Sequence, residues 1–186
     1  ELIGATPVCP SNDEETGARA LTNAEVRELV ADFVAAAVRC DKAGFDGVEL
    51  HGAHGYIICQ FLSSELNQRG DEYGGSLENR SRLLFEMLDG IRQSCRPDLI
   101  VGVRLSPERF GMKLAEVIQV AQRLFDSELL DFLDMSLWDV FKQPEEPAYE
   151  DQSLLACFTA LARGETRLAV AGNIRAPADA AKALEA

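Results

Sequence analysis

The hydrophobic positions of this sequence follow two patterns, helical spacing and short continuous runs. Apolar side chains recur every three or four positions over residues 26–40, 83–91 and 114–124, which predicts amphipathic helices. A helix is also expected around residues 153–162, and another begins at Pro177, a residue type favoured in the first helical turn. Between the helices, apolar runs predict strands near residues 47–51, 100–105, 132–135 and 168–171.

Helices and strands alternate along the chain without a hairpin signal, and this order predicts the fold class. Strands joined through helices form right-handed crossovers, so the four strands are expected to be parallel and in consecutive order. The prediction is an α/β fold in which helices cover a parallel sheet, with residues 1–186 in a single domain.

Local signals mark the limits of the first helix. Thr22 and Glu25 have the T-x-x-E spacing of a capping box, and Gly44 ends the helix. Residues 1–21 are rich in Pro, Asn, Asp, Glu and Gly and have no periodicity. They are expected to form an irregular lead-in.

Composition supports a compact core and restricts the partners. Hydrophobic residues make up 47% of the chain and charged residues 26%. The formal net charge of −13 disfavours binding to nucleic acid or to an anionic membrane. A local phosphate site made from backbone N–H groups and one arginine remains compatible with that charge.

Cysteine usage and hydropathy bear on the compartment. The five cysteines are odd in number and irregularly spaced, as is typical of proteins from a reducing cytoplasm. Cys59 lies close to Ile58 and Phe61, so we expect it to be packed rather than to act as a redox switch. No apolar run approaches the ~20 residues of a membrane span. We therefore expect a cytoplasmic protein.

Polar residues follow each predicted strand. The first strand leads into HGAHGY at 51–56, and the second leads into RLSP at 104–107. Ser136 follows the third strand, and Gly172 and Asn173 follow the fourth. Ligands of parallel α/β folds bind at the carboxyl ends of the strands, so these residues are candidates for one shared site.

The first of these motifs holds the only two histidines of the sequence, His51 and His54, together with Tyr56. A zinc site needs three or four ligands, and only Glu49 or Cys59 stands near enough in sequence to add one, so no metal is expected. A purely structural role is the second alternative. The third is chemical: two imidazoles donate hydrogen bonds to a carbonyl oxygen while the phenol delivers a proton.

Several stretches of the sequence carry a family resemblance. Residues 43–56 read AGFDGVELHGAHGY, followed by QFLS at 60–63, NQR at 67–69 and DEYGGSLENR at 71–80. VGVRLSP at 101–107 and VAGN at 170–173 follow in the same order. Together these stretches resemble the signature of the Old Yellow Enzyme family, from Leu21 nearly to the C-terminus.

The resemblance implies an FMN-dependent oxidoreductase with a TIM (β/α)8 barrel. Such an enzyme takes hydride from NADH or NADPH and reduces the activated C=C bond of a small α,β-unsaturated carbonyl compound. His51 and His54 resemble the pair that binds the substrate carbonyl, and Tyr56 resembles the proton donor.

The resemblance also implies how the cofactor is held. Arg104 resembles the arginine beside the flavin pyrimidine edge, where a cation favours the anionic reduced flavin. Gly172 and Asn173 resemble the first phosphate-binding turn, with main-chain N–H groups and the following helix N-terminus facing the FMN phosphate. A strand-end salt bridge is the alternative role of Arg104.

Two positions depart from the family pattern: Gly70 stands where Thr is usual, and Ser64 where Pro is usual. We interpret the glycine-containing loop around them as mainly structural. Trp138 and Phe141, just after the third strand, either line the pocket rim or cover the mouth of the barrel.

The resemblance further implies a partial barrel. The 186 residues are fewer than the roughly 250 of a whole (β/α)8 barrel. We expect strands four to seven of the family barrel with their helices, and the open sheet edges favour a homo-oligomer. The alternatives are a phosphate-binding barrel lyase or isomerase and a truncated, non-catalytic fragment.

Overall fold

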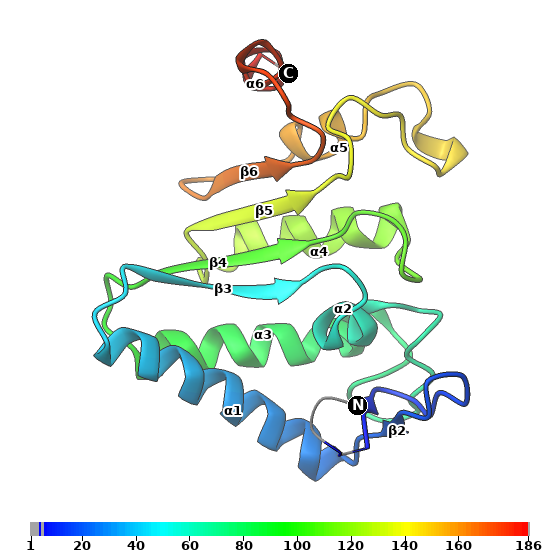
Figure 1. The fold of residues 1–186 in the computed structure, drawn as a ribbon, viewed down its shortest axis with the longest axis vertical. Helices are drawn as coiled ribbons and strands as arrows, with labels where there is room; N and C mark the ends of the chain where they lie inside the picture. Colours follow the sequence, from blue (N-terminus) through cyan, green and yellow to red (C-terminus); the bar gives the residue numbers. More distant parts are fainter. Residues whose placement is uncertain (1–3, 5, 186) are drawn as a thin grey trace.

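The computed structural model describes residue 4 and residues 6–185, and its centre is a four-stranded parallel sheet (Figure 1). The strands are β3 (Gly47–Gly52), β4 (Ile100–Leu105), β5 (Phe132–Ser136) and β6 (Arg167–Ala171). They are hydrogen-bonded in the order β3-β4-β5-β6, and every neighbouring pair is parallel. This confirms the predicted strands and their order.

Three long helices connect or precede these strands, as the periodicity predicted. They are α1 (Asn23–Lys42), α3 (Leu77–Ser94) and α4 (Leu114–Asp126). The predicted capping box of α1 is present, because Thr22 and Glu25 each accept a backbone N–H from the other. After α1 the chain turns at Gly44, whose φ of 83° is a conformation that favours glycine.

The shorter elements differ from the prediction. The structure has a helix α2 (Ile57–Leu62) that the sequence pattern did not predict, and α5 (Ala156–Thr159) is shorter than the expected helix over 153–162. Leu161 N–H bonds back to Phe158 O and Gly164 has a φ of 55°, so the chain leaves the helix early. The last helix, α6 (Pro177–Leu184), begins at the predicted proline.

The lead-in is not wholly irregular. Two short strands, β1 (Val8–Cys9) and β2 (Arg19–Ala20), pair with each other, and a 3-10 turn (Pro147–Tyr149) lies in the loop after β5. Within the described residues, no helix combines the length and the apolar character needed to cross a membrane.

The two faces of the large sheet have different environments. Alternate side chains, such as Leu50, Val103 and Leu133, are buried in a core shared with α3 and α4. The opposite face carries Arg104 and Asp134, which are partly exposed. Alternate positions of a strand face opposite sides. The sheet therefore has one face for packing and one polar face.

The polar loop after α2 is held by internal hydrogen bonds. The Asn67 side chain donates to two backbone carbonyls at 2.7 and 2.8 Å. Arg69 donates to Pro10 O at 2.9 Å, to Asn23 Oδ1 at 2.8 Å and to Asp71 Oδ2 at 2.7 Å. These bonds join the lead-in to the loop and to α1, in agreement with the structural interpretation of this loop.

The polar face is closely packed where β4 and β5 meet. A Cβ at Gly102 would lie 2.1 Å from Cζ of Phe132, so Gly102→Ala is expected to lower the free energy of unfolding by about 1–3 kcal/mol through overpacking. Urea denaturation measures this change. Gly70→Ala is the matched control, because no atom lies within 4 Å of the added Cβ.

The same contact predicts coupling between the two residues. In the double variant Gly102→Ala/Phe132→Ala, the decrease in the free energy of unfolding should be smaller than the sum of the decreases in the two single variants. Additive losses, or equal losses at Gly102 and Gly70, would contradict this packing.

Candidate active site

The site begins where β3 and β4 end. His51 pairs with Arg104 in the register of these parallel strands, so both side chains stand on the polar face of the sheet. Gly172 and Asn173 follow the end of β6, two strands further along the same sheet. The predicted site residues therefore share the carboxyl edge of the sheet.

A tight turn brings the three rings of the HGAHGY motif together. His54 has a φ of 59° and Gly55 a φ of 74°, two consecutive left-handed residues that reverse the chain after β3. A left-handed histidine is uncommon, and such backbone strain is concentrated at functional sites. Tyr56 then forms the N-cap of α2. The turn thus aims three polar rings into one region.

The distances between these rings are short. The ring centroid of His51 lies 5.0 Å from that of His54 and 5.2 Å from that of Tyr56. Tyr56 is 63% exposed, so its phenol is open to solvent at the mouth of the site. Two imidazoles and one phenol therefore lie within about 5 Å of one another, with His51 at the centre.

Residues from the next two strands contact His54. Its backbone N–H donates to Ser106 Oγ at 3.1 Å, and its Nε2 lies 2.8 Å from Ser136 Oγ. Ser106 and Ser136 were recognised in the sequence only as polar residues at strand ends. No sequence signal indicated their contacts with His54.

The surroundings of His51 disfavour its charged form. Burial is the main cause that lowers the pKa of His51, and the neighbouring His54 and Arg104 lower it further. Glu49, two positions before His51 on the same face, has a raised pKa because of burial and the nearby Asp134. A neutral imidazole can donate one hydrogen bond without carrying a charge.

Two aromatic side chains, those of Phe110 and Trp138, lie near His54. The ring centroid of Phe110 lies 6.3 Å from that of His54, in an edge-to-face arrangement. Trp138 is 65% exposed and lies under the guanidinium of Arg109, 4.4 Å from its Cζ. Phe110 and Arg109 were not recognised from the sequence. Trp138 lines a small pocket together with His54 and Phe110, and the choice between the two predicted roles of Trp138 and Phe141 stays a prediction.

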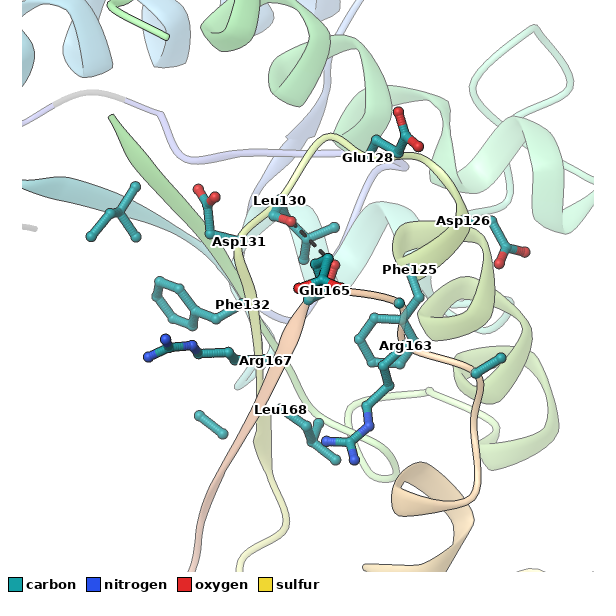
Figure 2. A pocket seen from close by; sticks show the side chains of 15 residues that line it. Phe125, Asp126, Glu128, Leu130, Asp131, Phe132, Arg163, Glu165, Arg167 and Leu168 are labelled. Carbon is teal, nitrogen blue, oxygen red and sulfur yellow. Dashed lines mark hydrogen bonds between the residues drawn. The ribbon is translucent and has the colours of Figure 1, made fainter. Parts of the chain in front are cut away.

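A large cavity lies elsewhere in the described part of the chain. It has a volume of about 1120 Å³ and is located at the amino ends of β5 and β6, around Asp131, Phe132 and Arg167 (Figure 2). It opens beside β6, the last strand of the sheet, at the end opposite to His51. This cavity is therefore separate from the candidate site, whose residues lie at the carboxyl ends of the strands.

Metal ligands and thiols contribute little to this region. Among the described residues, no group of three His, Cys, Asp or Glu side chains is arranged to hold a metal ion. Cys59 is fully buried, and burial raises the pKa of its thiol. The packed role expected for Cys59 agrees with this environment.

Comparison with known proteins identifies the family. A family model described as "NADH:flavin oxidoreductase / NADH oxidase family" matches residues 5–181. The chain belongs to this family.

Curated relatives and solved structures agree with this assignment. The NADPH dehydrogenase of Clostridium acetobutylicum is 41% identical over 144 residues, which are 73% of this chain and 42% of that protein. The probable flavin mononucleotide-dependent alkene reductase of Leishmania infantum is 45% identical over 127 residues, 66% of this chain and 34% of that protein. The chain thus spans less than half the length of these relatives.

A solved structure extends the comparison to the fold. The Old Yellow Enzyme homologue of Zymomonas mobilis superposes with a TM-score of 0.79 at 30% identity, covering 98% of this chain and 55% of that one. The sheet β3 to β6 with its helices is therefore part of a (β/α)8 barrel, as expected.

The residues at the strand ends fit the flavin that gives this family its name. Arg104 Nε is buried and has no hydrogen-bond partner within the described part of the chain, although Asp134 Oδ2 lies 3.2 Å away. The charges attract, but the N–H does not point along a hydrogen bond. The guanidinium therefore has donors left for the oxygen and nitrogen acceptors of a flavin pyrimidine edge.

The turn after β6 fits a phosphate only in part. Gly172 has a φ of 151°, and a Cβ there would lie 2.7 Å from the Trp138 backbone, so only glycine allows this close packing. The N-terminus of α6 is already capped, because Asp179 Oδ2 accepts the N–H groups of Arg175 and Ala176. The Asn173 side chain donates to Asp139 Oδ2 at 3.0 Å, so two carboxylates lie beside this turn, and the phosphate role of Gly172 and Asn173 stays a prediction.

The pKa of His51 gives a direct test of the site's electrostatics. NMR titration of its ring proton should give a midpoint below the ordinary value of 6.5. Because the pKa is lowered in the folded state, the unfolded chain binds more protons between the two values, so stability falls as the pH drops through this window. Arg104→Met should raise the midpoint only partly, because burial is the larger cause. A midpoint at or above 6.5 would contradict this environment.

Proposed function

We propose that this chain carries the substrate site of an FMN-dependent ene-reductase, which uses NADH or NADPH to reduce the activated C=C bond of α,β-unsaturated carbonyl compounds. The observation that carries the proposal is the cluster of His51, His54 and Tyr56, with ring centroids about 5 Å apart next to Arg104. The names of the relatives, a NADPH dehydrogenase and a probable alkene reductase, support the reaction class.

The two histidines act on the substrate carbonyl. Their ring N–H groups donate hydrogen bonds to the carbonyl oxygen and withdraw electron density, so the β-carbon becomes electrophilic. The neutral state of His51 suits this role, because a donor without net charge activates the carbonyl and keeps the nearby Arg104 free of like-charge repulsion.

Tyr56 supplies the proton. Its phenol stands at the start of α2 and delivers the proton to the α-carbon as charge develops there. FMN, when bound, supplies the hydride that it receives from NAD(P)H. Arg104 would hold the pyrimidine edge of FMN, and the turn at Gly172 and Asn173 would hold its phosphate. The five unpaired cysteines fit a reducing compartment, and we propose the cytoplasm.

Replacement of the phenol tests the proton-donor role. Tyr56→Phe should slow enone reduction by about 10²–10⁴-fold, the range of general-acid catalysis. Reduction of the bound flavin by NAD(P)H should remain nearly unchanged. Stopped-flow absorbance follows the two half-reactions separately.

The control for this experiment is Tyr149→Phe, which removes a phenol hydroxyl from the 3-10 turn after β5 and should change neither rate. His51→Ala and His54→Ala should weaken ligand binding as well as the rate, because they act on the ground state and the transition state alike. An equal loss in both half-reactions for Tyr56→Phe would show that Tyr56 holds the flavin or the fold.

Arg104 is tested through cofactor affinity. Arg104→Met removes charged hydrogen-bond donors, so the dissociation constant of FMN should rise by about 10- to 100-fold. Quenching of flavin fluorescence on binding measures this constant. Arg27→Met is the matched control, because Arg27 lies on α1 in an exposed ion pair with Glu72. Unchanged FMN affinity in Arg104→Met would contradict the cofactor role of Arg104. Its ion pair with Asp134 would then be its structural role.

A further inference from the structure

Two serine hydroxyls hold His54 from different directions. Ser106 Oγ accepts the His54 backbone N–H at 3.1 Å, and Ser136 Oγ lies 2.8 Å from Nε2 of the ring. Ser106 is only 2% exposed, and both serines stand at the ends of strands of the rigid sheet. The position of His54 is therefore fixed at its backbone and at its ring.

This support matters because His54 has an uncommon backbone conformation. Its φ of 59° lies in the left-handed region, which costs free energy for any residue with a Cβ. Such a conformation persists only when surrounding contacts determine it. The bond to Ser106 provides one such contact, and the edge of the Phe110 ring provides another.

The second neighbour of Ser136, Arg104, favours one direction for the hydrogen bond between Ser136 and His54. Arg104 Nη2 donates to Ser136 Oγ over 3.5 Å, a long bond. A guanidinium donates and never accepts, so the serine oxygen is the acceptor in this contact. With one lone pair engaged by Arg104, the serine proton is available to its other neighbour, the His54 Nε2 at 2.8 Å.

A neutral imidazole has one N–H donor and one bare nitrogen acceptor. If Nε2 accepts from Ser136, the ring proton lies on Nδ1. The geometry points to Ser136 as a positioning residue that fixes His54 in its Nδ1–H tautomer and so presents Nδ1–H to the substrate carbonyl. This inference rests on the proposed function of His54 as a carbonyl ligand.

The arrangement also links the two halves of the site. One hydroxyl contacts both Arg104, which we assign to the cofactor, and His54, which we assign to the substrate. Loss of that hydroxyl leaves the imidazole free to take the other tautomer, with the proton on the wrong nitrogen. Binding of the substrate carbonyl is then weakened. Tyr56 and the groups that serve flavin reduction are unchanged.

The tautomer itself is the decisive readout. Nitrogen-15 NMR of labelled histidine in the flavin-loaded protein at pH 8, with signals assigned through His54→Asn, distinguishes Nδ1–H from Nε2–H. The wild type should show Nδ1–H at His54, Ser136→Ala should lose this preference, and Ser136→Thr, which keeps a hydroxyl, should restore it. Ser94→Ala, at the exposed end of α3, is the control and should show the wild-type tautomer.

Ligand binding gives the second readout. The dissociation constant of cyclohexanone, a carbonyl ligand without a reducible C=C bond, should rise about 5- to 10-fold in Ser136→Ala, the loss of one hydrogen bond. The KM for an enone should rise with it, whereas flavin reduction should stay unchanged. A purely structural role of Ser136 would change the unfolding free energy without changing the tautomer.

The outcomes separate this inference from the proposed function. Nε2–H at His54 in the wild type, or Nδ1–H retained in Ser136→Ala, overturns the role of Ser136 even in an active ene-reductase. A wild-type protein that reduces no enone overturns the proposed function, and the NMR result still decides whether Ser136 sets the tautomer.

Discussion

The register between β3 and β4 is the constraint on which the site depends. Gly47 to Gly52 pair one by one with Ile100 to Leu105, and this pairing sets His51 opposite Arg104. A Cβ at Gly47 would lie 2.6 Å from Ile100 O, and one at Gly52 would lie 2.9 Å from Arg104 O. The two glycines therefore allow the strands this close approach. A slip of one residue would turn His51 toward the helices, because neighbouring strand positions face opposite sides.

The polar face of the sheet carries the charged side chains that surround Arg104. Arg104 lies between two acidic side chains of the same face, Glu49 and Asp134, in a protein whose net charge is −13. A cation in such surroundings is locally compensated yet keeps donors for an incoming acceptor. Burial is the main cause that raises the pKa of Glu49, and the nearby Asp134 raises it further, whereas Arg104 lowers it. The loops after β4 and β5 then complete the site with Phe110 and Trp138.

Much of this structure follows from the sequence pattern because its long helices and strands have clear periodicities. The helix α2 was not predicted because its six residues, IICQFL, are almost all apolar and carry no helical period. Helix α2 packs against α3 and β3 with four of its six residues buried, so tertiary contacts stabilise it. Likewise α5 is shorter than expected because Gly164 and the turn at Leu161 end it.

The placement of the candidate residues at the strand ends was predictable from the sequence, but their contacts were not. His51, His54, Tyr56 and Arg104 follow from strand-end position and family resemblance, and their roles remain proposals. The bond between His54 and Ser136 joins residues 82 positions apart, so no local pattern encodes it. Parallel sheets bring such distant residues together only after folding.

The central claim is that an enone bound at this strand-end cluster is reduced at its C=C bond rather than at its C=O bond. The most direct measurement is product analysis after anaerobic incubation of the flavin-loaded protein with NADPH and 2-cyclohexenone. The account predicts cyclohexanone, one molecule for each NADPH oxidised. Formation of the allylic alcohol, or no consumption of the enone while NADPH still reduces the flavin, would contradict it.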